Sequence, residues 1–246
     1  MQNADFDTVS RYSELPLSAS MGLQTRDFFQ RQTFAVACPD LLDFGCADGH
    51  NLLALARVPR LLSSAVGVDV ATVPIAELKE KLAADAELAA RVQALHLTRP
   101  DASELQEFFG ERRFDVVLMS FVFHHVDASV REAVLQELLR RISSCGSLIL
   151  CEFSEDTCTR LGFDLKIGEV VTRLKNEFGF KVVDALEDDR DVARPPESEE
   201  EQSAAEVPAH SHSHSHSHSH SHSHSHGHSR RKIYGKFELR FFHLKR

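Results

Sequence analysis

Residues 41–56, LLDFGCADGHNLLALA, decide the fold. The apolar run at 41–44 predicts a buried strand, and residues 51–56 pass directly into a helical pattern. Between the two lies the turn Gly45-Cys46-Ala47-Asp48-Gly49. Glycine at a strand end lets a ligand approach the backbone closely, and the turn leads to a helix N-terminus. This arrangement predicts a binding site for a nucleotide-like ligand.

The spacing of the glycines separates the classes of ligand. A dinucleotide fingerprint that starts at Gly45 needs glycine at positions 47 and 50, which are Ala47 and His50. A phosphate-binding P-loop needs Gly-Lys followed by Ser or Thr, which the chain lacks. Asp43 and Asp48 would repel a pyrophosphate and attract a positive charge. The loop therefore suits a cationic ligand.

The chain beyond this loop alternates apolar runs with segments at helical spacing, which is typical of a parallel sheet with crossover helices. We expect strands at 41–44, 65–68, 92–97, 115–119 and 147–151. We expect helices at 51–56, 73–90, 102–109, 129–142 and 166–178, the fourth opened by a capping box of Ser129 and Glu132.

Two more strand-like segments, 180–186 and 233–244, are interpreted as an antiparallel pair that closes the sheet. Phe237, Leu239 and Phe241 alternate with polar neighbours, so the C-terminal segment should belong to the fold. Low-complexity sequence separates the pair, with histidine at every even position from 210 to 228. The expected organisation is an N-terminal cap segment at 1–40, the main domain at 41–186, a disordered acidic and His-Ser insertion at 187–231, and the final strand at 232–246.

Charge and cysteine content exclude several function classes. The chain has a formal net charge of -9, and residues 1–186 carry -8 of it, so the main domain lacks the basic surface that nucleic acids need. The five cysteines form no C-x-x-C pair, which disfavours a zinc finger or disulfide framework and fits a reducing compartment. No secretory signal or membrane span is recognisable. We expect a soluble cytoplasmic protein with neither a membrane nor a nucleic acid as partner.

Residues 42–49 resemble the first motif of the class I S-adenosylmethionine-dependent methyltransferases, which is an apolar strand, an acid and G-x-G-x-G. Ala47 stands at the family's middle glycine, and costs about 1 kcal/mol if that position needs a positive φ. Later segments match the family's order at Ala65–Asp69, Asp101-Ala102 and Phe114–Ser120. The resemblance implies an α/β fold with a doubly wound, mostly parallel seven-stranded sheet whose last strand is antiparallel.

The same resemblance implies S-adenosylmethionine as cofactor and places residues around it. The loop under the methionine part would comprise Asp43, Gly45, Cys46, Ala47 and Gly49. Asp69 would accept the ribose hydroxyls with Val70 beside it, Asp101 and Ala102 would border the adenine, and Met119 and Ser120 would line the methyl-donor side. From the residues themselves, Asp101 equally reads as a helix N-cap.

His124 and His125 follow the fourth strand, where a doubly wound sheet places its reacting groups. Imidazole suits proton removal near neutral pH, so both are candidate catalytic residues, although the pair could simply pack or cap the next helix. The Asn/Asp-Pro-Pro-Tyr/Phe signature of nucleic-acid amino methylation and the Asp-x-x-Tyr form of some protein-lysine methylators are absent. We therefore expect methyl transfer to a small molecule.

Two alternatives remain open from the sequence. The first is a protein or RNA methyltransferase, and the second is a metal-handling or regulatory binding protein on the same fold without turnover. The alternate imidazoles of the His-Ser repeat would bind divalent metal ions incidentally, whereas no metal ligand is assigned in the main domain.

Overall fold

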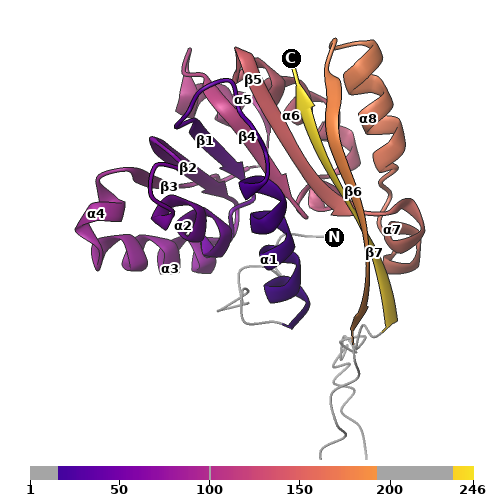
Figure 1. Cartoon of the computed structure of the whole chain (residues 1–246), viewed down its shortest axis with the longest axis horizontal. Coiled ribbons are helices and arrows are strands. Elements are labelled where there is room, and N and C mark those ends of the chain that lie inside the picture. The colour runs from indigo at the N-terminus through magenta and orange to yellow at the C-terminus, as the bar shows by residue number, and fades with distance from the viewer. Residues whose placement is uncertain (1–15, 100, 193–234) are drawn as a thin grey trace, which may run out of the picture. The chain divides into compact units, whose positions relative to one another are not determined.

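The computed structural model describes residues 16–99, 101–192 and 235–246. Its seven strands form one sheet in the order β3-β2-β1-β4-β5-β7-β6 (Figure 1). Neighbouring strands from β3 to β5 pair in parallel, and β7 pairs antiparallel with β5. The strands are β1 (Asp40–Phe44), β2 (Ser64–Asp69), β3 (Val92–His96), β4 (Phe114–Ser120), β5 (Ile142–Phe153), β6 (Lys181–Val192) and β7 (Gly235–Lys245). The predicted fold class is confirmed.

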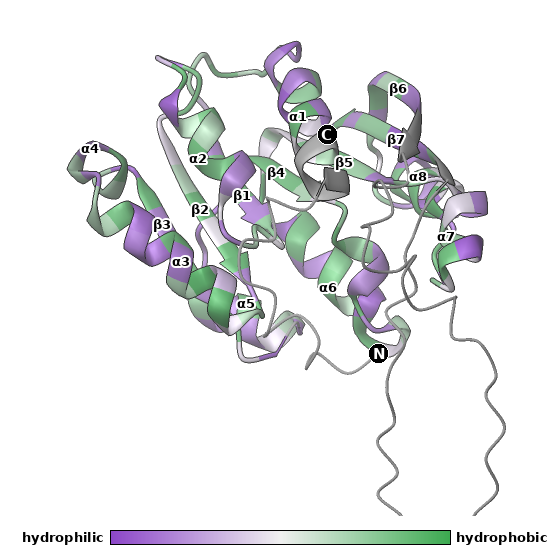
Figure 2. Cartoon of the chain, turned by 90° about the horizontal axis from the view of Figure 1, so that it is seen from below, coloured by the Kyte–Doolittle hydropathy of each residue, from purple (hydrophilic) through white to green (hydrophobic). Residues whose placement is uncertain are grey.

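Helices lie on both faces of this sheet, with α1 in front of it and α6 behind it in Figure 1. Each α-helix and the short 3₁₀ turn η3 is bounded as follows: α1 (Pro16–Gln30), α2 (His50–Arg57), α3 (Thr72–Ala83), α4 (Ala86–Ala89), α5 (Ala102–Phe109), η3 (Phe123–His125), α6 (Ala128–Arg140), α7 (Glu155–Leu161) and α8 (Ile167–Asn176). Hydrophobic and hydrophilic residues alternate along α3 in Figure 2, and its buried side chains include Ile75, Leu78 and Leu82. Such an amphipathic helix stabilises the fold by burying one face against the sheet. None of the described helices is long and apolar enough to cross a membrane.

Two predicted helices have different ends in the structure. The segment expected as one helix at 73–90 is two helices, because Asp85 leaves helical geometry and accepts a hydrogen bond from the Leu88 N–H. The helix expected at 129–142 begins one residue earlier, and its N-cap is Asp127, which accepts from the Ser129 N–H at 2.8 Å. The predicted capping box is therefore wrong, and Glu132 instead forms an ion pair with Arg173 of α8. Helix α7, opened by the N-cap Ser154, was not predicted.

The C-terminal segment belongs to the fold, as predicted. Phe237, Leu239 and Phe241 of β7 are all buried, and Phe241 lies opposite Cys151 of β5 in the antiparallel register. The preceding strand β6 continues to Val192, six residues beyond the predicted strand end at 186. The rest of the expected insertion, from 193 to 231, lies outside the described residues, so its predicted disorder and the domain boundaries stay predictions.

Candidate active site

The loop after β1 has the backbone geometry that close ligand approach requires. Gly45, Ala47 and Gly49 all have positive φ, at 79°, 47° and 74°. The N–H groups of Gly45 and Cys46 both donate to the Val68 carbonyl of β2, which ties the loop to the sheet. A Cβ at Gly45 would lie 2.5 Å from the Cβ of Val122, so only glycine fits there. The alanine at position 47 therefore does occupy a conformation that glycine adopts more readily.

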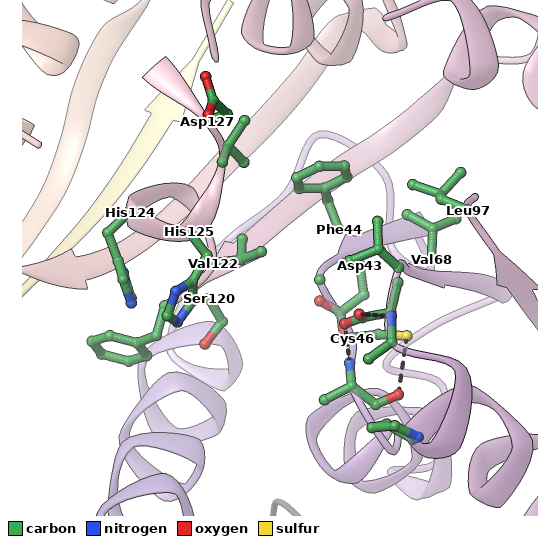
Figure 3. Close-up of a pocket in the computed structure, with 18 of the residues that line it drawn as sticks. Asp43, Phe44, Cys46, Val68, Leu97, Ser120, Val122, His124, His125 and Asp127 are labelled. Carbon is green, nitrogen blue, oxygen red and sulfur yellow. Dashed lines mark hydrogen bonds between the residues drawn. The ribbon is translucent and has the colours of Figure 1, made fainter. Parts of the chain in front are cut away.

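A cavity of about 780 Å³ opens beside this loop. Figure 3 shows Asp43 and Cys46 on one side of it and Ser120, His124 and His125 on the other. The predicted residues that line it are Asp43, Gly45, Cys46, Ala47, Asp69, Val70, Asp101, Ser120, His124 and His125. Three predicted cofactor residues do not line it: Gly49 packs toward Leu78, Met119 is buried in the core, and Ala102 lies in the first turn of α5.

Asp69 joins the two turns that border the cavity. Its Oδ2 accepts the Ala47 N–H and its Oδ1 accepts the Ala71 N–H, both at 2.8 Å. Burial raises the pKa of this carboxyl, although the backbone hydrogen bonds from Ala71 and Ala47 partly offset it. Each carboxylate oxygen has a further lone pair, so Asp69 could accept a pair of vicinal hydroxyls while it holds the loop.

Asp43 is the buried acid at the floor of the cavity. Burial, with a contribution from the charge of Asp69, raises its pKa to about 7. A cation in the cavity would therefore stabilise the ionised carboxylate. Asp48 was predicted to share this attraction, but its Oδ2 lies 2.9 Å from Lys81 Nζ, which neutralises it. The attraction for a cationic ligand is thus provided by Asp43 and Asp69 rather than by Asp43 and Asp48.

Asp101 has the N-cap role that the sequence allowed, and its predicted contact with an adenine stays a prediction. It is the N-cap of α5 and accepts from the Glu104 N–H at 2.9 Å and from Ser103 Oγ at 2.7 Å, and it also lines the cavity. The Glu104 carboxylate in turn accepts the N–H groups of Thr98 and Arg99. Together these bonds fix the turn after β3 at the cavity edge.

Helix α1 forms a further wall, from the segment predicted as an N-terminal cap. Met21 and Gly22 line the cavity, and Thr25 Oγ1 lies 2.8 Å from Ser120 Oγ at the end of β4. Arg26 Nη1 is 2.9 Å from Nε2 of His50, a cavity residue that follows the glycine loop. Residues 1–15 of the predicted cap segment lie outside the described residues.

The histidine pair lies across the cavity from Asp43 and Cys46 in Figure 3, and the two residues differ. The His124 side chain is 2% exposed and its Nδ1 lies 2.5 Å from Oε1 of Glu152, a fully buried residue of β5. The His125 ring contacts the His124 ring at a tilt of 50°, with 3.9 Å between centroids, and is the more exposed of the two. Sequence reasoning missed Glu152, although a single acid inside the apolar strand segment 147–153 was a usable signal.

Comparison with known proteins agrees with this architecture. Residues 41–146 match the family described as "Methyltransferase domain". This match covers less than half of the chain, and it agrees with the resemblance of the sequence to the class I S-adenosylmethionine-dependent methyltransferases. A search of curated protein sequences finds no match.

Solved structures with the same fold share little sequence with this chain. The N-methyltransferase NodS from Bradyrhizobium japonicum WM9, in complex with S-adenosyl-L-homocysteine, is 13% identical, with a TM-score of 0.60 over 98% of this chain and 95% of its own. Magnesium protoporphyrin IX methyltransferase from Synechocystis PCC 6803, with bound S-adenosylmethionine, is 12% identical, with a TM-score of 0.58 over 97% and 85%. The [4+2]-cyclase SpnF is 17% identical, with a TM-score of 0.58 over 91% and 80%. At these identities the likeness concerns the fold.

Proposed function

We propose that this protein binds S-adenosylmethionine in the cavity and transfers its methyl group to a small molecule. The observation that carries the proposal is the placement of the buried Asp43 and the partly buried Asp69 around a positive-φ glycine loop at the ends of β1 and β2. Asp69 would hold the ribose, Asp43 would face the positively charged amino-acid end, and Asp101 would lie at the adenine. When bound, S-adenosylmethionine supplies a sulfonium methyl group, whose carbon bonds to an acceptor lone pair while the C–S electrons stay on sulfur.

The chain's own contribution to this reaction would be alignment and proton transfer. His125 lines the cavity, and its pKa is lowered to about 3 by burial and by the charge of His124. Its imidazole is therefore neutral at physiological pH and has a lone pair to accept the proton that the acceptor loses. His124, predicted as an equal candidate, is engaged with Glu152 and is assigned a supporting role.

A small-molecule substrate is supported by the enclosure of the acceptor end. Helix α1 closes one side at Met21 and Gly22, and Phe163 in the loop after α7 closes another. Among the solved structures of the same fold, the named substrate of the Synechocystis enzyme, magnesium protoporphyrin IX, is a small molecule. All five cysteines are free thiols, which supports the cytoplasmic location that we also propose. Incidental divalent metal binding by the His-Ser repeat remains part of the proposal.

The first test is calorimetry with S-adenosylmethionine and S-adenosylhomocysteine. Binding of both is expected, and binding of neither would refute the cofactor assignment. The second test supplies radiolabelled S-adenosylmethionine to cell extract that has been fractionated by size. Label in small-molecule fractions is expected, whereas label only in protein or RNA would overturn the substrate class. Cofactor binding without any transfer would favour a binding role or a different reaction on this fold, as the likeness to the [4+2]-cyclase illustrates.

A further inference from the structure

Glu152 is the most buried acid near the histidine pair, and both of its carboxylate oxygens accept hydrogen bonds. Its Oε2 accepts the N–H groups of Phe123 and His124, at 3.1 and 3.3 Å. Its Oε1 accepts the Phe153 N–H at 3.1 Å and Nδ1 of His124 at 2.5 Å. One carboxylate on β5 thereby holds the backbone of η3 and the ring of the histidine within it.

The bond to Glu152 sets the protonation pattern of the His124 ring. Since the ionised carboxylate only accepts hydrogen bonds, Nδ1 of His124 must carry the proton. The ring is further held by aromatic contacts, with centroid distances of 5.1 Å to Phe153 and 4.3 Å to Phe163. His124 is therefore fixed in its rotamer, with a proton on Nδ1.

The His125 ring contacts the fixed ring of His124. Its imidazole lies 3.9 Å from the His124 centroid and meets Phe163 edge-on, with an interplanar angle of 86°. Charged groups on the surrounding elements are Asp127 and Arg131 at the start of α6, Asp164 after α7, and Asp43 across the cavity. Arg131 is held by the Val126 and Asp164 carbonyls, so His124 is the nearest group whose charge acts on His125.

We propose that Glu152 is a positioning residue that acts through His124 to aim the His125 imidazole at the methyl acceptor. This inference rests on the proposed function and extends it. A neutral imidazole accepts a proton, so the substrate atom that it serves carries a hydrogen, as in a hydroxyl, whose methylated oxonium is acidic enough to protonate an imidazole of low pKa. During transfer the acceptor's lone pair bonds to the methyl carbon and its proton passes to His125.

The test follows the imidazole rings of the intact chain by NMR, with ¹⁵N-labelled histidine, from pH 5 to 8. His124→Asn keeps a side-chain N–H donor for Glu152 and removes the neighbouring ring and its charge. Glu152→Gln keeps the size of the side chain and removes its charge. Glu137→Gln is the matched control, because Glu137 is an equally buried carboxylate, paired with Arg141 on α6.

In the native protein His124 should show the proton on Nδ1, and His125 should stay neutral throughout the range. In His124→Asn the protonated fraction of His125 at pH 5 should rise about tenfold or more, since loss of a nearby like charge raises a pKa by about 1 unit or more. Glu152→Gln replaces one of the two acceptor oxygens by an NH₂ donor, so the ¹⁵N signal of His124 Nδ1 should shift, and in Glu137→Gln neither ring should change. An unchanged His125 in His124→Asn would overturn the proposal even if Glu152→Gln fails to fold.

Calorimetry on the same variants separates this inference from the proposed function. Glu137 does not line the cavity, so Glu137→Gln should bind S-adenosylmethionine within about twofold of the native affinity. If the native protein does not bind the cofactor, the proposed function fails. If the native protein binds the cofactor but neither His124→Asn nor Glu152→Gln changes the NMR signals of His125, the positioning role alone fails.

Discussion

Replacing Ala47 with glycine should stabilise the protein, because alanine occupies a left-handed backbone conformation at φ 47°. A residue with a Cβ in that region destabilises the folded state by about 1–2 kcal/mol. Glycine removes this strain, but it also makes the unfolded chain more flexible, which reduces the gain by about 0.5–1 kcal/mol. The net gain in the free energy of unfolding is about 0.5–1 kcal/mol. For a domain of this size the midpoint of thermal unfolding should rise by about 2–3 °C.

The matched control is Ala54→Gly, seven residues further on in the interior of α2. There the backbone is helical, so glycine should lower the free energy of unfolding by about 1 kcal/mol. Thermal unfolding monitored by circular dichroism measures both variants against the native chain. Opposite signs for the two substitutions are expected. A lower midpoint for Ala47→Gly would show that positive φ at this position causes no strain.

Three other measurements probe the site. Gly45→Ala should abolish cofactor binding and lower the unfolding midpoint, because the added Cβ meets Val122. The control is Gly179→Ala, which is also at positive φ but has open space around it, so it should lower stability only by the backbone strain. Asp69→Asn should weaken S-adenosylmethionine binding about 10- to 100-fold in calorimetry, because hydrogen bonds to a charged acceptor contribute about 1.5–3 kcal/mol, and an unchanged affinity would place the ribose elsewhere. The pKa of Asp43 is higher in the folded protein, about 7, than its ordinary value of 3.8, so its contribution to stability is complete below pH 3.8 and is lost as the pH rises through 7. The urea midpoint should therefore fall less between pH 5 and pH 8 in Asp43→Asn than in the native protein.

Local sequence patterns predicted the parts of the site that depend on one strand and the turn after it. Asp43, Gly45 and Asp69 lie at the carboxyl ends of parallel strands, and such ends converge in this class of sheet. The positive φ of Ala47 was predictable in the same way, because this alanine stands at the position of the family's middle glycine.

Contacts between distant segments were not predictable in this way. Asp48 is neutralised by Lys81, 33 positions away, and His124 is oriented by Glu152, 28 positions away. No single-segment pattern carries the information that these partners meet. The N-cap of α6 also differed, because Asp127 and Ser129 are both good caps and the structure uses the first of them.

The position of β7 between β5 and β6 has a consequence for how the protein is made. Cys151 pairs with Phe241, so one of the central ladders of the sheet joins residues 90 positions apart. During synthesis β6 leaves the ribosome long before the strand that must fit between it and β5. Until then the edge of β5 offers unpaired backbone groups to any other extended chain, which is an aggregation hazard. The nascent protein would depend on chaperones during this interval.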